Sequence, residues 1–254
     1  GGAYRFTNDR ESEPLACAFL AEGYHVFSLR YSTEKGIYPA ALEQLARTVR
    51  LIRQNAGEWH VRKDAIVIAG FSAGGHLAAE YACKWDRPAL SAVAEAEREE
   101  LRPNALVLGY PVITAGAAAH EESIHNLLGA QDTPKMRRSV SLETQVSGCV
   151  PPVFLWHTAT DEMVNAENSL LFASALAREK IPYELHIYGT GVHGVSLGTR
   201  ATVGEEKHVS HGCAGWFAQN FPVRVIKMPP RRISPARGHS KFNQRISNNS
   251  LRLI

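Results

Sequence analysis

The sequence predicts an α/β fold, with a mostly parallel sheet and helices on both of its faces. Short runs rich in β-branched and aromatic residues alternate along the chain with longer stretches that place apolar residues three or four positions apart. Several of the short runs are apolar throughout, as expected for strands that are covered on both faces. Such alternation indicates crossover connections, and 254 residues with 44% hydrophobic content are enough for one domain of this class.

The predicted elements follow one another in regular order. Strands are expected at 24–30, 65–70, 104–110, 152–157 and 183–188. Helices are expected at 39–55, 73–84 and 165–180, with further helix in 114–148 and a surface helix that contains Glu95, Glu97, Glu99 and Glu100. Folds of this kind place their chemistry in the loops that follow the carboxyl ends of parallel strands, so these loops are where functional residues are expected.

Charge divides the chain into two parts. Eight of the 28 Lys and Arg residues lie in residues 222–254, which contain no Asp or Glu. The remaining 20 basic and 25 acidic residues give residues 1–221 a net charge of −5, although the whole chain has a net charge of +3. The sequence therefore predicts an acidic folded domain at 1–221 and a basic, disordered tail at 222–254.

Cysteine spacing and hydropathy exclude several classes of protein. Cys17, Cys83, Cys149 and Cys213 form no CxxC pair, which argues against a zinc site and a disulfide framework and favours reduced, mostly buried thiols. No apolar stretch approaches the roughly 18 residues of a membrane helix. We expect a cytoplasmic protein. Secretion stays open, because the sequence begins at Gly1 and not at Met.

A serine lies in a glycine-rich turn directly after the 65–70 strand. The turn reads Gly70-Phe71-Ser72-Ala73-Gly74, a G-x-S-x-G pattern between a predicted strand and a predicted helix. In this context the pattern is typical of a nucleophile held on a sharp turn, where the glycines let strand and helix approach each other. The alternative is a plain glycine-rich turn capped by Ser72.

Two later strands are each followed by a residue that could complete a catalytic triad. Asp161 follows the 152–157 strand and His193 follows the 183–188 strand. The order Ser72, Asp161, His193 is that of α/β-hydrolase triads, in which the carboxylate orients the imidazole and the imidazole takes the serine proton. Asp161 could instead cap a helix, and the neighbouring Glu162 competes for the same role.

An oxyanion hole is the remaining part of such a site. The backbone N–H of Ala73, next to the nucleophile, is expected to be one donor. The second donor should come from a glycine-rich loop after an earlier strand, and residues Gly2 and Ala3 lie in such a loop.

With these residues the chain resembles bacterial α/β-hydrolases related to acetyl-xylan esterases and to feruloyl-esterase-like hydrolases. The segments that carry the resemblance are 1–6, 24–31, 70–76, 108–114, 154–158 together with Asp161, and 193–197. The resemblance runs from residue 1 to about residue 220 and implies a serine esterase with a Ser72, His193, Asp161 triad. It favours acetylated xylan or xylo-oligosaccharides as substrates.

The chain departs from this family pattern in two places. Family members carry strands before the glycine-rich loop, one of them inside the sheet and next to the strand of the nucleophile. That strand is absent here, so we expect a gap in the sheet and an N-terminally truncated domain. Residues 222–254 have no counterpart in the family.

The resemblance implies no metal and no organic cofactor. The expected partner is a small ester or an acetylated oligosaccharide, with no nucleic acid and no membrane; the sequence does not indicate an oligomeric state. Two other functions stay open. One is a peptidase or amidase, because the same triad cleaves both kinds of bond; the other is a catalytically silent binding module.

Overall fold

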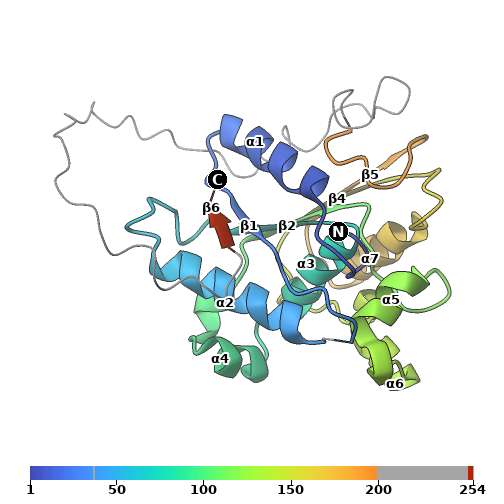
Figure 1. Cartoon of the computed structure of the whole chain (residues 1–254), viewed down its shortest axis with the longest axis horizontal. Helices are drawn as coiled ribbons and strands as arrows, with labels where there is room; N and C mark the ends of the chain where they lie inside the picture. Colours follow the sequence, from blue (N-terminus) through green and yellow to red (C-terminus); the bar gives the residue numbers. More distant parts are fainter. Residues whose placement is uncertain (37, 199–250, 254) are drawn as a thin grey trace.

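In the computed structural model, which describes residues 1–36, 38–198 and 251–253, the central feature is a four-stranded parallel sheet in the order β2-β3-β4-β5 (Figure 1). The strands are β2 at Val67–Phe71, β3 at Ala105–Gly109, β4 at Val153–Thr158 and β5 at Tyr183–Tyr188. Each strand pairs with the next one in the chain. All carboxyl ends therefore meet at one edge of the sheet, as the alternating pattern predicts.

Helices connect the strands and precede them. The α-helices are α1 at Glu13–Ala21, α2 at Ala40–Gln54, α3 at Ala73–Lys84, α4 at Pro88–Ala94, α5 at Glu121–Leu128, α6 at Pro134–Val140 and α7 at Glu167–Arg178. Short 3₁₀ turns lie at Asp9–Glu11, Arg98–Leu101, Gly129–Gln131 and Leu142–Thr144. No helix among the described residues combines the length and the apolar character that crossing a membrane requires.

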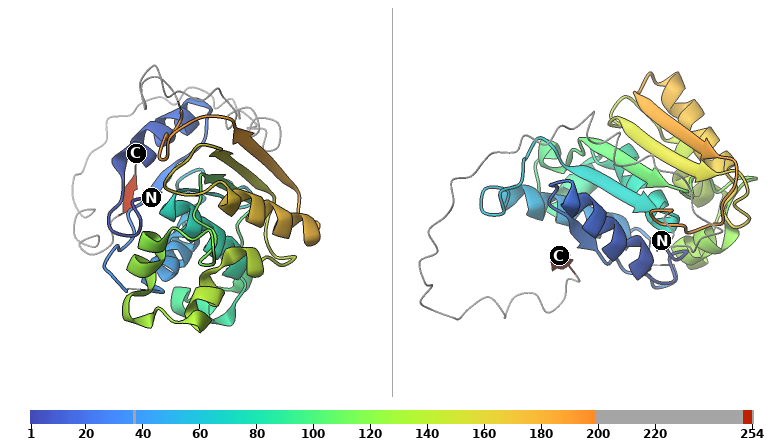
Figure 2. Two further views of the ribbon diagram at one scale, coloured as in Figure 1. Left: turned by 90° about the vertical axis from the view of Figure 1, so that its right-hand side faces the viewer. Right: turned by 90° about the horizontal axis from the view of Figure 1, so that it is seen from above.

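The two faces of the sheet contact two different apolar clusters. Leu106 and Leu108 of β3 face the larger cluster, which includes residues of α2, α3 and α7. Val107, between them, faces a smaller cluster that includes Leu15 of α1. Figures 1 and 2 show α1 on one side of the sheet and α2, α3 and α7 on the other. The uninterrupted apolar sequence of β3 follows from this, since all five residues are buried.

The first strand does not join this sheet. β1 is only Phe27–Leu29 and pairs antiparallel with β6 at Leu251–Leu253. Among the described residues, β2 pairs with β3 alone, and a cavity of about 280 Å³ lies between β1 and β2. The sheet therefore stops beside the strand of Ser72 on this side, and the proposed truncation stays a prediction.

Three expectations need correction or fall outside the structure. The predicted glutamate-rich helix is wrong: α4 ends at Ala94, Glu95 adopts a left-handed φ of 50°, and a 3₁₀ turn follows. Of the thiols, Cys83 is buried, Cys17 is exposed and Cys149 is intermediate, and all three are free. Cys213 lies outside the described residues, as does the proposed tail at 222–254 except for β6.

β2 and α3 approach each other closely at the turn that joins them. A Cβ atom added to Gly70 would lie 2.1 Å from the carbonyl oxygen of Gly74 and 2.7 Å from the Cβ of Ala78. A Cβ added to Gly75 would lie 2.7 Å from Pro111. There is no room for one methyl group where strand and helix meet. This explains why the motif requires glycine at these positions.

We expect Gly70→Ala to lower the free energy of unfolding by about 1–3 kcal/mol or more, because the backbone must move to relieve the overlap. Chemical denaturation measures this change. Gly57→Ala is the matched control, since an added Cβ at Gly57 meets no atom within 4 Å. Equal stability of the two variants would contradict the close approach.

Candidate active site

Ser72 occupies a strained turn at the start of α3. Its φ of 55° and ψ of −125° lie in a region that residues with a side chain rarely adopt. The strain is held by backbone hydrogen bonds: the Ser72 N–H donates to the carbonyl of Gly109 at 3.0 Å, and the Ser72 carbonyl accepts from Val112 at 3.1 Å. Both partners lie in or just after β3, so the neighbouring strand fixes the turn.

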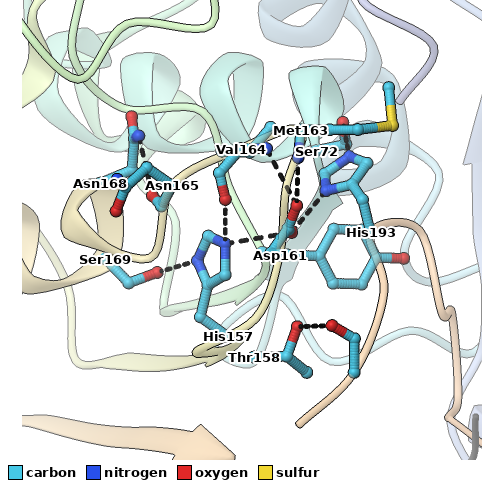
Figure 3. Close-up of polar contacts among 12 residues, drawn as sticks. Ser72, His157, Thr158, Asp161, Met163, Val164, Asn165, Asn168, Ser169 and His193 are labelled. Carbon is cyan, nitrogen blue, oxygen red and sulfur yellow. Dashed lines mark hydrogen bonds and ion pairs between the residues drawn. The ribbon is translucent and has the colours of Figure 1, made fainter.

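The side chains of Ser72, His193 and Asp161 form a hydrogen-bonded series (Figure 3). His193 Nδ1 lies 2.7 Å from Asp161 Oδ2, and His193 Nε2 lies 2.8 Å from Ser72 Oγ. An ionised carboxylate only accepts, so Nδ1–H donates to it, and Nε2 is left to accept from the serine hydroxyl. The structure thus brings together the three residues that were singled out as a triad.

The carboxylate of Asp161 is fully enclosed and well supplied with donors. Its side chain is 0% exposed, and its Oδ1 atom accepts from the N–H groups of Met163 and Val164 at 3.0 and 2.9 Å. Burial alone raises the pKa of Asp161, but contacts from His157, His193 and Val164 outweigh it and hold that pKa well below the usual range. Asp161 is therefore an anion at neutral pH.

The geometry bears on both alternatives for this loop, helix capping by Asp161 and a catalytic role for Glu162. Asp161 does cap a turn through Oδ1, yet its other oxygen faces His193, so one carboxylate has both roles. α7 begins only at Glu167 and has Ala166 at its N-cap position. Glu162 is exposed and none of the described contacts joins it to His193.

The glycine-rich N-terminal loop lies against the Ser72 turn. Gly2 and Ala3 both have positive φ, 85° and 53°, and a Cβ added to Gly74 would lie 3.0 Å from the Gly1 nitrogen. Within the described residues, the backbone N–H groups of Gly2, Ala3 and Ala73 donate to no carbonyl or side chain. Unpaired N–H groups beside a nucleophile are what an oxyanion hole requires.

This loop is anchored by a buried histidine. The hydroxyl of Tyr4 lies 2.9 Å from His76 Nδ1, and His76 Nε2 lies 2.9 Å from the carbonyl of Val140. A carbonyl only accepts, so Nε2–H donates to it and Nδ1 accepts from Tyr4. Burial lowers the pKa of His76, which keeps the ring neutral as this pattern requires. Asn126 of α5 also donates to the carbonyl of Ala3 at 2.9 Å.

A tyrosine supports the loop that carries His193. The ring of Tyr110 packs edge-to-face against His193 with centroids 5.0 Å apart. Its hydroxyl accepts from the Ser196 N–H at 2.9 Å and donates to Glu11 Oε1 at 2.9 Å. The histidine loop is thereby connected to the 3₁₀ turn before α1.

Sequence reasoning missed several residues around the site. Tyr110, Glu11 and Tyr4 are joined to the triad or the oxyanion loop by contacts between residues far apart in the chain, which no local pattern shows. His157 is different, because its place four residues before Asp161 at the end of a strand is a local signal. Among the described residues, no group of three or more His, Cys, Asp or Glu side chains is arranged to hold a metal ion.

The BD-FAE family model matches residues 1–176. The chain is 37% identical to "Endo-1,4-beta-xylanase B" of Butyrivibrio fibrisolvens over 89% of this chain and 35% of that protein. It is 28% identical to "Acetylxylan esterase" of Xylanibacter ruminicola over 78% of this chain and 40% of that protein. It thus spans well under half the length of these two curated relatives.

A solved structure is similar over most of both chains. It is the acetyl ester-xyloside bifunctional hydrolase from Caldicellulosiruptor lactoaceticus, with a TM-score of 0.74 and 36% sequence identity. The alignment covers 86% of this chain and 80% of that chain. The aligned part of this chain therefore has the fold of a hydrolase of known structure.

We expect Asp161→Asn to slow the reaction of Ser72 with a fluorophosphonate on the order of 10³-fold or more, because an amide no longer holds His193 in the required tautomer. The rate of covalent labelling measures this loss. Glu162→Gln removes the neighbouring exposed carboxylate and should label at the wild-type rate. Slow labelling of Glu162→Gln together with wild-type labelling of Asp161→Asn would assign the role of the triad carboxylate to Glu162.

We also expect the labelling rate to fall at acid pH with a single protonation. Protonated His193 cannot accept the serine proton, whereas Asp161, whose pKa is lowered, stays ionised over the same range. The logarithm of the rate constant plotted against pH therefore has a slope of about one on its acid side. A slope near two would show that Asp161 titrates as well.

Proposed function

The chain belongs to the BD-FAE family of α/β-hydrolases, and on this premise we propose that it is a serine esterase that removes acetyl groups from xylan or xylo-oligosaccharides. The observation that carries the proposal is the hydrogen-bonded series from Asp161 through His193 to Ser72. The series ends on a hydroxyl that is held on a strained turn at the carboxyl end of β2. Each residue then has one role in acyl transfer.

The first half of the reaction forms an acyl-enzyme. Ser72 Oγ attacks the ester carbonyl carbon while His193 Nε2 takes the hydroxyl proton, and Asp161 stabilises the resulting imidazolium. The carbonyl oxygen becomes an oxyanion, which would accept hydrogen bonds from the N–H of Ala73 and from Gly2 or Ala3. His193 then gives its proton to the leaving sugar oxygen as the carbon–oxygen bond breaks.

The second half releases the acyl group with water. His193 takes a proton from the water molecule as its oxygen attacks the acyl carbon, and the same N–H groups hold the second oxyanion. The bond to Ser72 breaks, the proton returns to Ser72 Oγ, and a carboxylic acid leaves. The residues named supply every proton transfer in this sequence.

The substrate class rests on the relatives. The names "Acetylxylan esterase" and acetyl ester-xyloside bifunctional hydrolase describe two of the proteins that this chain is similar to. We carry their shared chemistry, an acetyl ester on a xylose unit, to this chain.

Two other functions make different predictions. A peptidase or amidase with the same triad would cleave amides at rates comparable to those for esters. A silent binding module would bind acetylated sugars without turnover. The hydrogen-bond distance between Ser72 and His193 favours an active enzyme over this alternative.

We expect Ser72→Ala to abolish hydrolysis of a short-chain aryl ester and of acetylated xylo-oligosaccharides, because it removes the nucleophile. Acetate release and aryl alcohol absorbance measure the loss, and far-UV circular dichroism checks the fold. Ser174→Ala is the control, since Ser174 is exposed on α7. Persistent turnover by the Ser72 variant would overturn the assignment.

The same assay can rank substrates. Wild-type protein should release acetate from xylo-oligosaccharides faster than it hydrolyses feruloylated sugars, longer-chain aryl esters or aryl amides. A preference for aryl amides would favour the peptidase alternative. Binding without acetate release would favour the silent module.

A further inference from the structure

A second histidine contacts the carboxylate of Asp161 from the side of the strand. His157 lies in β4, is 0% exposed, and has its Nε2 atom 3.3 Å from Asp161 Oδ2 (Figure 3). This is the same carboxylate oxygen that lies 2.7 Å from His193 Nδ1. One buried oxygen thus has two imidazole rings beside it, and the triad uses only one of them.

The proton position on His157 follows from its other partners. Its Nε2 lies 2.8 Å from the carbonyl of Val164, and its Nδ1 lies 2.8 Å from Ser169 Oγ of α7. The carbonyl can only accept, so Nε2 carries a proton, and in the neutral ring Nδ1 accepts from the serine hydroxyl. The proton on Nε2 therefore lies between the Val164 carbonyl and the Asp161 carboxylate.

These contacts hold both sides of the turn that presents Asp161. The Val164 N–H donates to Asp161 Oδ1, while the Val164 carbonyl accepts from His157. The histidine thus fixes the far end of the turn and places a positive N–H dipole next to the carboxylate. A buried histidine that only connected β4 to α7 through Ser169 would need neither contact.

We propose that His157 is a positioning residue for catalysis, which keeps the Asp161 carboxylate turned toward His193. The inference rests on the proposed function in that Ser72 must be the nucleophile. It extends the site from three side chains to a series of five: Ser169, His157, Asp161, His193 and Ser72. His157 acts through Asp161 and touches no reacting atom.

Other titratable groups also face this site. His193 approaches Asp161 from the loop after β5, and His120, at the N-cap of α5, interacts electrostatically with both. Burial and the proximity of His193 lower the pKa of His120. Glu162 is exposed. Of the groups that these elements turn toward Asp161, His157 is the one that is fully buried and shares a carboxylate oxygen with His193.

The test measures the pH dependence of Ser72 labelling by a fluorophosphonate in the full chain. Without the donor from His157, the Asp161 carboxylate is held less firmly toward His193, and its charge, matched by one donor fewer, stabilises protonated His193 more strongly. His157→Leu should therefore label about tenfold or more slowly at neutral pH, with the acid side of its profile moved to higher pH. His157→Gln, which keeps an N–H donor, should recover most of the rate and of the profile.

A control separates positioning from general stability. Tyr81→Phe removes a buried hydroxyl that donates to the carbonyl of Leu101, outside the series of five. It should lower the thermal unfolding temperature and leave the pH profile of labelling unchanged. A shifted profile in this control would mean that lost stability alone moves the profile, which would overturn the inference.

The outcomes for His157 are distinct from those for the proposed function. A folded His157→Leu variant with the wild-type profile and a rate within about twofold of wild type would overturn the positioning role. If His157→Leu fails to fold, Ser169→Ala replaces it in the test, since it removes the hydrogen-bond partner of His157 Nδ1. A shift of the acid side of the labelling profile to higher pH in this variant supports the positioning role, and an unchanged profile overturns it. Wild-type protein that is labelled but hydrolyses no ester would refute the proposed function alone.

Discussion

The close approach of β2 and α3 is the constraint on which the site depends. Gly70 and Gly74 meet with no space for a methyl group, so the chain between them can only turn sharply, and Ser72 is forced to a φ of 55°. The strain is offset by ordinary backbone hydrogen bonds to Gly109 and Val112 of the neighbouring segment. The sheet and the turn thus stabilise each other, and the hydroxyl emerges at the edge where the other strands also end.

The buried carboxylate of Asp161 is the second constraint on the site. An anion with no exposure to water must be matched by donors, and Asp161 has two backbone N–H groups on one oxygen and two imidazoles beside the other. The donors come from its own turn, from β4 and from the loop after β5. The position of the carboxylate is therefore set by several elements at once, and this fixes the tautomer of His193 in turn.

Local sequence patterns are sufficient to predict where the triad residues lie. Ser72, Asp161 and His193 each lie directly after a strand, so their meeting at one edge follows from the parallel sheet alone. The roles of Tyr110 and Glu11 could not be predicted, because they are 99 positions apart and meet only in the folded chain. The prediction of a glutamate-rich helix was wrong for a related reason. These residues have high helix propensity, but Glu95 takes the left-handed conformation that ends α4.

The segment between β3 and β4, which has no recognisable motif, contacts both the N-terminal loop and the residues before α2. Asn126 donates to the carbonyl of Ala3, and its own carbonyl accepts from Gly36. Gly129 lies against Gly36 so closely that a Cβ on it would be 2.6 Å from the Gly36 Cα. His120, at the N-cap of α5, interacts electrostatically with His193, so this helix is linked to the oxyanion loop at one residue and to the triad at another. A displacement of α5 would therefore shift the carbonyl of Ala3 as well, which couples the position of this helix to the geometry of the oxyanion donors.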